Sequence, residues 1–338
     1  MKRAIKAAAV AMTGMLAVTA CTSASGGDDT GSTTINIVGF AVPEAANKAI
    51  ATEFNKTDAG EGVKFSGSYG ASGDQSRKVE AGAEADYVHF SIEPDVTRLV
   101  DAGLVAEDWN SGPTKGIVSQ SVAVLVVPKG NPKDIDGWED LVRDDVKVIT
   151  ADPASSGAAK WNILAAYSQA IADGRSEKEA HEYLKALFAN VSQWAGSGRE
   201  ATEAFDKGIG DVLITYENEA ILALQSGKEY EYVVPDNTFL IENPGAILED
   251  ADPKAADWLE FVLSDEGQTE FVKKGFRPVT DLDISDIEVQ GANDPANPFP
   301  TPANLTTVDD LGGWSEINKK WFDDGALYSQ LYEAATKQ

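Results

Sequence analysis

Hydrophobic positions along the chain follow two different spacings in turn. Short runs rich in Val, Ile, Phe and Tyr, typical of strands, are separated by longer stretches in which apolar residues recur every three or four positions, as in amphipathic helices. Trp258, Phe261 and Val262 show this helical spacing, as do Phe271 and Val272 further along, so we expect these side chains in a hydrophobic core. Strands that alternate with helices predict an α/β architecture.

The same pattern predicts where the individual elements lie. Strands are predicted at residues 35–40, 63–68, 86–90, 121–127, 146–150, 211–215 and 230–234. Helices are predicted at residues 44–55, 74–81, 95–102, 161–172, 177–188, 200–206, 253–262 and 266–274, with a final amphipathic helix around 313–335. Residues 281–306, rich in Asp, Pro and Asn, are predicted to form a long surface excursion. No hydrophilic linker divides the chain beyond residue 33, so a body of two lobes would need several chain crossings between them.

The N-terminus has the pattern of a bacterial export signal. Three basic residues within the first six positions precede an apolar run at 7–18, which is too short to span a membrane. The run ends in Val-Thr-Ala-Cys, which resembles a lipobox, and Cys21 is the only cysteine of the chain. We therefore predict that residues 1–20 are a signal peptide, that Cys21 is lipidated and that 21–33 form a flexible tether. The alternative is an ordinary secretory peptide with a chance cysteine. In the lipobox reading the protein is extracytoplasmic and anchored by lipid to the bacterial cell membrane.

Composition narrows the possible functions. The chain has 338 residues, a 43% hydrophobic share and a formal net charge of −27, which argues against nucleic acid or anionic lipid as a partner. The acidic surplus is most simply a solvated exterior. The chain has one cysteine and two histidines, too few for a disulfide scaffold and hardly enough for a zinc site or for Cys–His catalysis. We therefore expect no metal and no cofactor. His89 and His181 lack neighbours at ligand spacing and are expected at ordinary strand and helix positions.

Three segments place small residues directly before a predicted helix. They are residues 70–75, 155–161 and 196–200, and each contains Gly and Ser. A helix start has backbone N–H groups without internal partners and a partial positive charge, so an anion that reaches this backbone is bound without a cationic side chain. The alternative is simple N-capping, because Ser and Gly are common at helix starts.

The surroundings of these segments resemble one protein family. The segments that carry the resemblance are KGNPK at 129–133, WEDL at 138–141, VITADPASSGAAKWN at 148–162, LKALFANV at 184–191 and GIGDVLITYENEA at 208–220. In order and spacing they resemble the periplasmic sulfate- and thiosulfate-binding proteins, the substrate-capturing subunits of ABC importers. The resemblance extends from about residue 35 to 278 and returns at 312–314.

The resemblance implies a two-lobed class II periplasmic-binding fold with the ligand sealed in a cleft between the lobes. Lobe 1 is expected to comprise residues 34–124 and 231–338, and lobe 2 residues 125–230. In the family a dehydrated sulfate is held by backbone N–H groups, a Ser hydroxyl and an indole N–H. The implied partners are a membrane permease and its ATPase, and the protein is expected to be a monomer. The chain has no phosphate-binding loop of its own, which agrees with energy coupling in another chain.

The family's site residues transfer by motif position. The ligand-binding residues implied in this way are Ser72, Ser156, Gly157, Ala158, Gly198 and Tyr216, and the neighbours that could influence specificity are Asp74 and Arg199. Ser72 lies in the first loop, Ser156 to Ala158 form the second helix start, and Gly198 precedes Arg199 where the family has a small residue before Arg.

Three departures from the family pattern leave the identity of the oxyanion open. Tyr216 stands where the family has Trp, and its hydroxyl can accept as well as donate a hydrogen bond. Asp74 replaces a Lys of the first loop, and residues 41–44 replace an Asp-Pro turn. Phosphate, molybdate and small organic sulfonates are therefore alternatives to sulfate and thiosulfate.

A hydrolase is the alternative from another functional class. Glu217 and Glu219 bracket Asn218, and two carboxylates can share general acid–base work. However, positions i and i+2 do not share a helix face, and in the family these residues belong to a binding protein without catalysis. We therefore predict that the protein is not an enzyme. Trp138, Trp161 and Trp194 are expected to pack in the core or between lobes.

Overall fold

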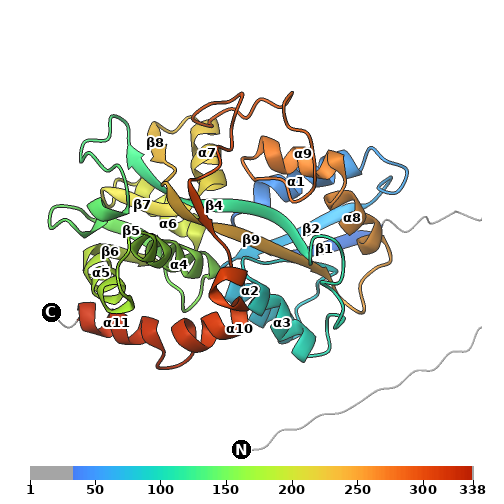
Figure 1. Ribbon diagram of the computed structural model, residues 1–338. Coiled ribbons are helices and arrows are strands. Elements are labelled where there is room, and N and C mark those ends of the chain that lie inside the picture. Colours follow the sequence, from blue (N-terminus) through green and yellow to red (C-terminus); the bar gives the residue numbers. More distant parts are fainter. Residues whose placement is uncertain (1–32, 337–338) are drawn as a thin grey trace, which may run out of the picture. The chain divides into compact units, whose positions relative to one another are not determined.

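The computed structural model describes residues 33–336, which form a mixed ten-stranded sheet covered by helices (Figure 1). The strands are β1 (Thr34–Phe40), β2 (Lys64–Gly70), β3 (Tyr87–His89), β4 (Ile117–Pro128), β5 (Val148–Ala151), β6 (Val191–Ala195), β7 (Val212–Tyr216), β8 (Tyr230–Val233), β9 (Asn237–Ile247) and β10 (Asn304–Thr306). The α-helices are α1 (Glu44–Phe54), α2 (Ser72–Glu80), α3 (Glu93–Asp101), α4 (Gly157–Ala172), α5 (Glu177–Asn190), α6 (Gly198–Asp206), α7 (Glu217–Gln225), α8 (Lys254–Val262), α9 (Asp265–Lys273), α10 (Gly313–Ile317) and α11 (Leu327–Thr336). Short helical turns occur at η1 (Trp138–Val142), η2 (Asp309–Leu311) and η3 (Asn318–Phe322).

Two long strands join two parallel parts of this sheet. The main strand order is β2-β1-β3-β9-β4-β7-β5-β6, with β1 to β3 parallel at one end and β5 to β7 parallel at the other. Strand β9 pairs with β3 through residues 245–247 and with β4 through 240–244, while β4 continues to pair with β7 through 123–126. Both strands therefore run from one part into the other (Figure 1). We call the elements around β1–β3 lobe 1 and those around β5–β7 lobe 2.

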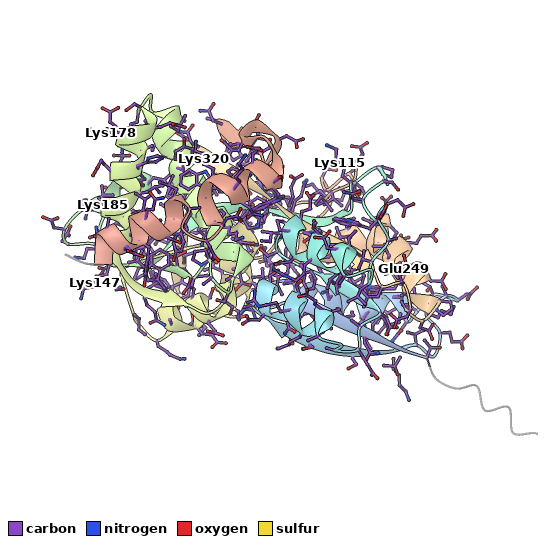
Figure 2. All side chains as sticks on the ribbon, turned by 90° about the horizontal axis from the view of Figure 1, so that it is seen from below. Lys115, Lys147, Lys178, Lys185, Glu249 and Lys320 are labelled. Carbon is purple, nitrogen blue, oxygen red and sulfur yellow. The ribbon has the colours of Figure 1, made fainter. Side chains whose placement is uncertain are left out.

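The central strands could be predicted from the sequence because they are buried and therefore consist mainly of apolar residues. Strands β5 and β7 are buried along their whole length, because helices cover both faces of a parallel sheet. Residues 122–127 of β4, which pairs antiparallel with β7 and β9, are also at most 2% exposed. Trp258 and Phe271 are fully buried in the core, as their helical spacing predicted. Within the described residues only Asp86, Asp95, Glu217 and Glu219 are buried carboxylates. Other charged groups, such as Lys178 and Lys320, lie on the surface (Figure 2).

The predicted strands and the eight predicted helices before residue 275 are confirmed, with ends that shift by up to four residues. Strands β6, β9 and β10 and helix α7 were not predicted. Strand β9 contains Asn243, Pro244 and Gly245, which interrupt its apolar pattern, and α7 follows directly on β7 without a turn. The surface excursion at 281–306 is irregular except for β10, which pairs with β9.

The prediction of a single final helix is wrong. The chain forms α10, the π-helical turn η3 and then α11, with a break at residues 323–326 that contains Gly325 in a left-handed conformation (φ 74°). Aromatic rings pack this segment against lobe 2. The ring centroids of Trp314 and Trp161 are 4.9 Å apart, and those of Trp321 and Tyr167 are 4.6 Å apart. Residues 313–336, which the predicted division places in lobe 1, therefore contact helices of lobe 2.

The predicted signal peptide, Cys21 and all of the tether except residue 33 lie outside the described residues. Between residues 33 and 336, no helix combines the length and the apolar character that crossing a membrane requires.

Candidate anion-binding site

The starts of six helices meet where the two lobes face each other. Gly73 N–H, at the start of α2, donates to the carbonyl of Ser155 just before α4 (3.2 Å). A methyl group added to Gly198, at the start of α6, would lie 3.3 Å from Ala158 of α4 and 3.5 Å from Val42, just before α1. The starts of α3 and α7 join through Ser91, described below. Helix starts carry partial positive charge, so their convergence favours an anion.

Several backbone N–H groups at these starts have no hydrogen-bond partner among the described residues. They are the N–H groups of Ser72, Gly157, Ala158 and Gly198. These four residues were all predicted from the sequence as ligand-binding, and all are nearly buried. Glycine at 157 is required by space, because a Cβ there would lie 2.6 Å from Ser91 Oγ. Buried unpaired donors that converge are what an oxyanion needs.

The two serines before α4 have different roles. Ser155 Oγ donates to the carbonyl of Gly196 (2.7 Å) and so ties the loop before α4 to the loop before α6. Ser156 is the N-cap residue of α4 and is 3% exposed, yet its hydroxyl makes no capping bond. Of the two hydroxyls, that of Ser156 is therefore the one without a partner among the described residues, while the assignment of Ser156 as a ligand-binding residue stays a prediction.

Ser72 lies at the site, but its hydroxyl is already engaged. Its Oγ donates to Asp95 Oδ2 (2.6 Å) and accepts from Ser91 N–H (2.9 Å). The Asp95 carboxylate also accepts from Arg98 Nη1 (3.2 Å). The hydroxyl proton of Ser72 thus serves Asp95, and Ser72 has its backbone N–H to offer an anion.

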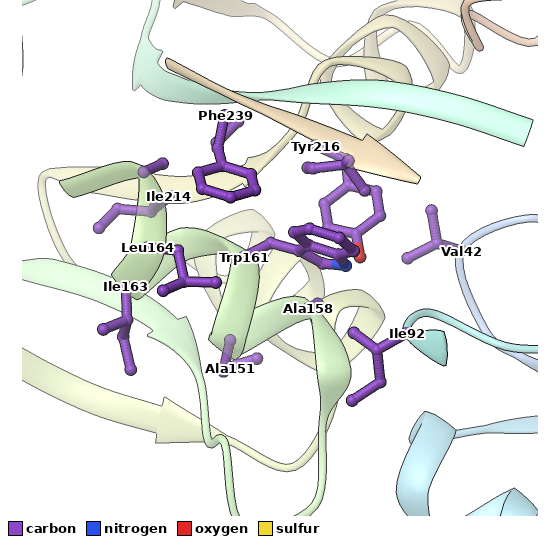
Figure 3. Packing of buried hydrophobic residues seen from close by; sticks show 14 of the residues in the cluster. Val42, Ile92, Ala151, Ala158, Trp161, Ile163, Leu164, Ile214, Tyr216 and Phe239 are labelled. Carbon is purple, nitrogen blue, oxygen red and sulfur yellow. The ribbon is translucent and has the colours of Figure 1, made fainter. Parts of the chain in front are cut away.

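Tyr216 is fully buried, and its hydroxyl lies 2.8 Å from Ser91 Oγ. Burial raises the pKa of this phenol well above its ordinary value, so it stays protonated. The indole of Trp161 donates to the carbonyl of the same Ser91 (2.9 Å), and Figure 3 shows the polar ends of Tyr216 and Trp161 on the side of Val42 and Ile92. Trp161 is a core residue, as predicted, but its indole N–H also has this polar contact.

Ser91 was missed by the sequence analysis. The available signal was weak: a small polar residue between the predicted strand that ends at 90 and the helix that begins near 95. This is the same small-residue pattern at a helix start, but without the glycine that marked the other three segments.

The two neighbours with a possible influence on specificity are both in ion pairs. Asp74 is half-exposed and pairs with Arg77 one turn further along α2 (2.5 Å). Arg199 binds Glu219 through two hydrogen bonds (2.8 and 3.0 Å) and also donates to the carbonyl of Val42 (3.4 Å). The positive charge of Arg199 is thus balanced next to the site.

The two glutamates considered for catalysis face different partners. Glu217 pairs with Arg277 through two hydrogen bonds (2.8 and 3.1 Å), while Glu219 pairs with Arg199. Burial raises the pKa of Glu217, and Arg277 opposes that shift. The two carboxylates therefore do not face a common point, as expected for residues two positions apart on a helix. Of the histidines, His89 is buried on β3 and His181 lies on α5.

Comparison with known proteins places this arrangement in a family. Residues 35–277 match the bacterial extracellular solute-binding proteins. The sulfate-binding protein of Synechococcus elongatus is 35% identical over 98% of this chain and 96% of its own length. The thiosulfate-binding protein of Pseudomonas aeruginosa is 32% identical over 82% and 84%. Among solved structures, the sulfate-binding protein SubI from Mycobacterium tuberculosis superimposes with a TM-score of 0.81 at 44% identity, covering 86% of this chain and all of that one. The fold is therefore the two-lobed class II periplasmic-binding fold, and the chain belongs to the bacterial extracellular solute-binding proteins, among the sulfate- and thiosulfate-binding members.

Proposed function

We propose that this protein is the solute-binding subunit of an ABC importer and that it captures sulfate or thiosulfate between its lobes. The observation that carries the proposal is the convergence of buried helix starts from both lobes, with unpaired N–H groups at Ser72, Gly157, Ala158 and Gly198 and the unpaired hydroxyl of Ser156. The names of the relatives support the same ligand class.

The donor set suits a fully ionised tetrahedral anion. Sulfate only accepts hydrogen bonds, and each bond from a neutral donor to a charged group contributes about 1.5–3 kcal/mol. The nearby cations do not supply free charge, because Arg199 is held by Glu219 and Arg98 contacts Asp95. We infer that Ser72, Gly157, Ala158 and Gly198 donate through the backbone and that Ser156 donates through its hydroxyl. Tyr216 supplies its single hydroxyl proton either to the anion directly or to the Ser91 hydroxyl that it contacts.

The division into lobes belongs to the same proposal. We place its boundaries at residues 124/125, inside β4, and 230/231, at the start of β8, with the C-terminal residues 313–336 lying along lobe 2. A ligand between lobes that are joined by β4 and β9 would be enclosed by rotation about these strands.

The remaining elements of the proposal concern partners and location. We propose that the protein is a monomer without enzymatic activity, anchored to the cell membrane through lipidated Cys21, and that it delivers its anion to a permease and its ATPase. Family membership supports an extracytoplasmic binding protein. Because Glu217 and Glu219 are each held by an arginine, neither is free for acid–base catalysis in the way a hydrolase requires.

Calorimetry of a protein that begins at residue 22, titrated with sulfate, thiosulfate, phosphate, molybdate and a small organic sulfonate, tests the function. We expect the tightest binding for sulfate or thiosulfate and no turnover of any of them. Tighter binding of another anion on the panel would change the ligand but keep the binding role. Absence of binding to all of them would overturn the proposal.

A further inference from the structure

Ser91 makes hydrogen bonds to residues of both lobes and of a strand that joins them. Its N–H donates to Ser72 Oγ, and its carbonyl accepts from the indole of Trp161 and from the amide of Asn243 (both 2.9 Å). Its hydroxyl bonds to Tyr216. The partners belong to α2 in lobe 1, to α4 and β7 in lobe 2 and to the joining strand β9. The backbone of Ser91 is thus held from both lobes, and its side chain contacts Tyr216 of lobe 2.

The Ser91 hydroxyl also lies against the start of α4. The methyl group of an alanine at Gly157 would meet Ser91 Oγ at 2.6 Å and Ser91 Cβ at 2.8 Å. Ser91 is fully buried and therefore makes its polar contacts without competition from bulk water. Its hydroxyl therefore lies close to the backbone of Gly157, whose N–H the proposed function assigns to the anion.

The Ser91–Tyr216 pair can reverse its direction. Each hydroxyl has one proton and can accept a hydrogen bond, and the bond between them uses one of the two protons. When Tyr216 donates, the proton of Ser91 is free for an anion that only accepts. When Ser91 donates to Tyr216, the Ser91 oxygen is free to accept a proton from the ligand, and the Tyr216 proton is left to donate to another oxygen of the ligand. Backbone N–H groups and an indole cannot reverse in this way.

We propose that Ser91 is a ligand-contacting, specificity-determining residue, and that its reversible bond to Tyr216 lets the site bind a singly protonated tetrahedral oxyanion, such as hydrogen phosphate, in addition to sulfate. The inference rests on the proposed function, because it assumes that the anion lies at the start of α4. Sulfate remains the tighter ligand, since every other donor at the site requires an acceptor.

The test measures sulfate and phosphate affinity by calorimetry at mildly alkaline pH, where hydrogen phosphate predominates. The proteins are the wild type, Ser91→Ala, Tyr216→Phe, the double variant and Ser168→Ala. Ser168 is a matched control because it is a buried serine of α4 whose hydroxyl has no partner among the described residues. Circular dichroism and thermal unfolding show whether each variant is folded.

We expect wild-type protein to bind sulfate tightly and phosphate measurably. Ser91→Ala should weaken sulfate by about tenfold, the loss of one hydrogen bond to a charged group. It should weaken phosphate by about a further tenfold, because the oxygen that accepts the ligand's proton is removed and the backbone N–H groups cannot replace it. The double variant should cost less than the sum of the single ones, since the two hydroxyls act as a pair. Ser168→Ala should leave both affinities unchanged.

Three results separate the possible failures. If Ser91→Ala shifts both affinities by the same factor, Ser91 is structural and the inference fails. If wild-type protein binds sulfate but no phosphate at millimolar concentration, the reversible pair fails while the proposed function stands. If wild-type protein binds no sulfate, the proposed function itself fails.

Discussion

Arg199 on α6 and Glu219 on α7 face each other through two hydrogen bonds of 2.8 and 3.0 Å, immediately beside the converging helix starts. Thr202 adds a third contact to the same carboxylate (3.3 Å), and the Glu219 side chain is only 1% exposed. The pair cancels a full positive charge next to the anion site. The attraction for an anion is therefore left to backbone N–H groups, which cannot be titrated and which select by geometry.

This pair leads to a prediction about stability. Arg199→Ala should lower the free energy of unfolding by about 3 kcal/mol, because it leaves the Glu219 charge buried and unpaired. Glu219→Gln in the same background should recover part of the loss. Urea denaturation measures both, and Asp74→Asn is the control, since a surface pair contributes about 1 kcal/mol at most. Equal effects of Arg199→Ala and Asp74→Asn would contradict the prediction.

The serines before α4 give a prediction about register. Ser156→Ala should weaken sulfate binding by about ten- to a hundredfold, or roughly 1.5–3 kcal/mol, because it removes one donor to a charged group. Ser155→Ala should weaken it less, since the Ser155 hydroxyl donates to the carbonyl of Gly196 instead. Titration calorimetry on the two variants decides the point. A larger loss for Ser155→Ala would show that the site residues are shifted by one position.

Asp74 is expected to have little influence on the choice of anion. Its carboxylate is half-exposed and paired with Arg77 on α2. Asp74→Asn should therefore change the ratio of sulfate to phosphate affinity by less than about tenfold, or roughly 1.4 kcal/mol, with sulfate preferred in both proteins. Competition binding with the two anions measures this ratio. Tight phosphate binding that disappears in Asp74→Asn would refute the sulfate assignment but keep the binding role.

The free energy of unfolding should decrease as the pH falls, because His89 is buried in its neutral form. Burial lowers the pKa of this imidazole to about 3, and its ring nitrogens contact only the neutral groups of Asn47 and Ser119. Between this pKa and the unfolded value of about 6.5, the unfolded chain binds a proton that the folded chain does not. The free energy of unfolding should therefore drop by about 1.4 kcal/mol per pH unit below 6.5 from this group.

Urea denaturation between pH 7 and 4 tests this dependence, with His89→Gln as the comparison. The variant should lose this part of the slope, whereas the contribution of other titrating groups should persist. His181→Gln is a second comparison, because burial lowers the pKa of His181 on α5 in the same direction, so this group contributes to the slope as well. Parallel slopes for wild type and His89→Gln would exclude His89 as the origin.

The N-terminal prediction concerns location alone. Cys21→Ser should release the protein from the membrane fraction or block its processing, because the lipid anchor is attached through this thiol. Sulfate affinity of the soluble domain should be unchanged, since the residues of the proposed site all lie beyond the predicted tether at 21–33. Cell fractionation with calorimetry on the released protein measures both, and lost binding in a protein that begins at residue 22 would show that the anchor segment has a further role.

Local patterns in the sequence determined the α/β class, most strands and helices, and three of the helix starts at the site. The spacing of hydrophobic residues and the presence of small residues before a helix depend only on near neighbours along the chain. Residues 155–161 could therefore be recognised as a helix start without any knowledge of the fold. Strand β9 was missed because its own composition is poor for a strand. It is stabilised by pairing with β3 and β4, which are distant in sequence.

Only the tertiary structure decided which hydroxyls remain unpaired at the candidate site. Ser72 and Asp95 are 23 positions apart, and Ser91 and Tyr216 are 125 positions apart, so no local pattern connects them. The same holds for Arg199 with Glu219 and for Glu217 with Arg277, which pair each carboxylate with a separate arginine. A hydrogen bond depends on where the fold brings two side chains together, whereas hydrophobic spacing depends on near neighbours along the chain. The sequence could therefore predict helix starts of the kind that suit an anion, and only the fold shows which proton each of them still has to offer.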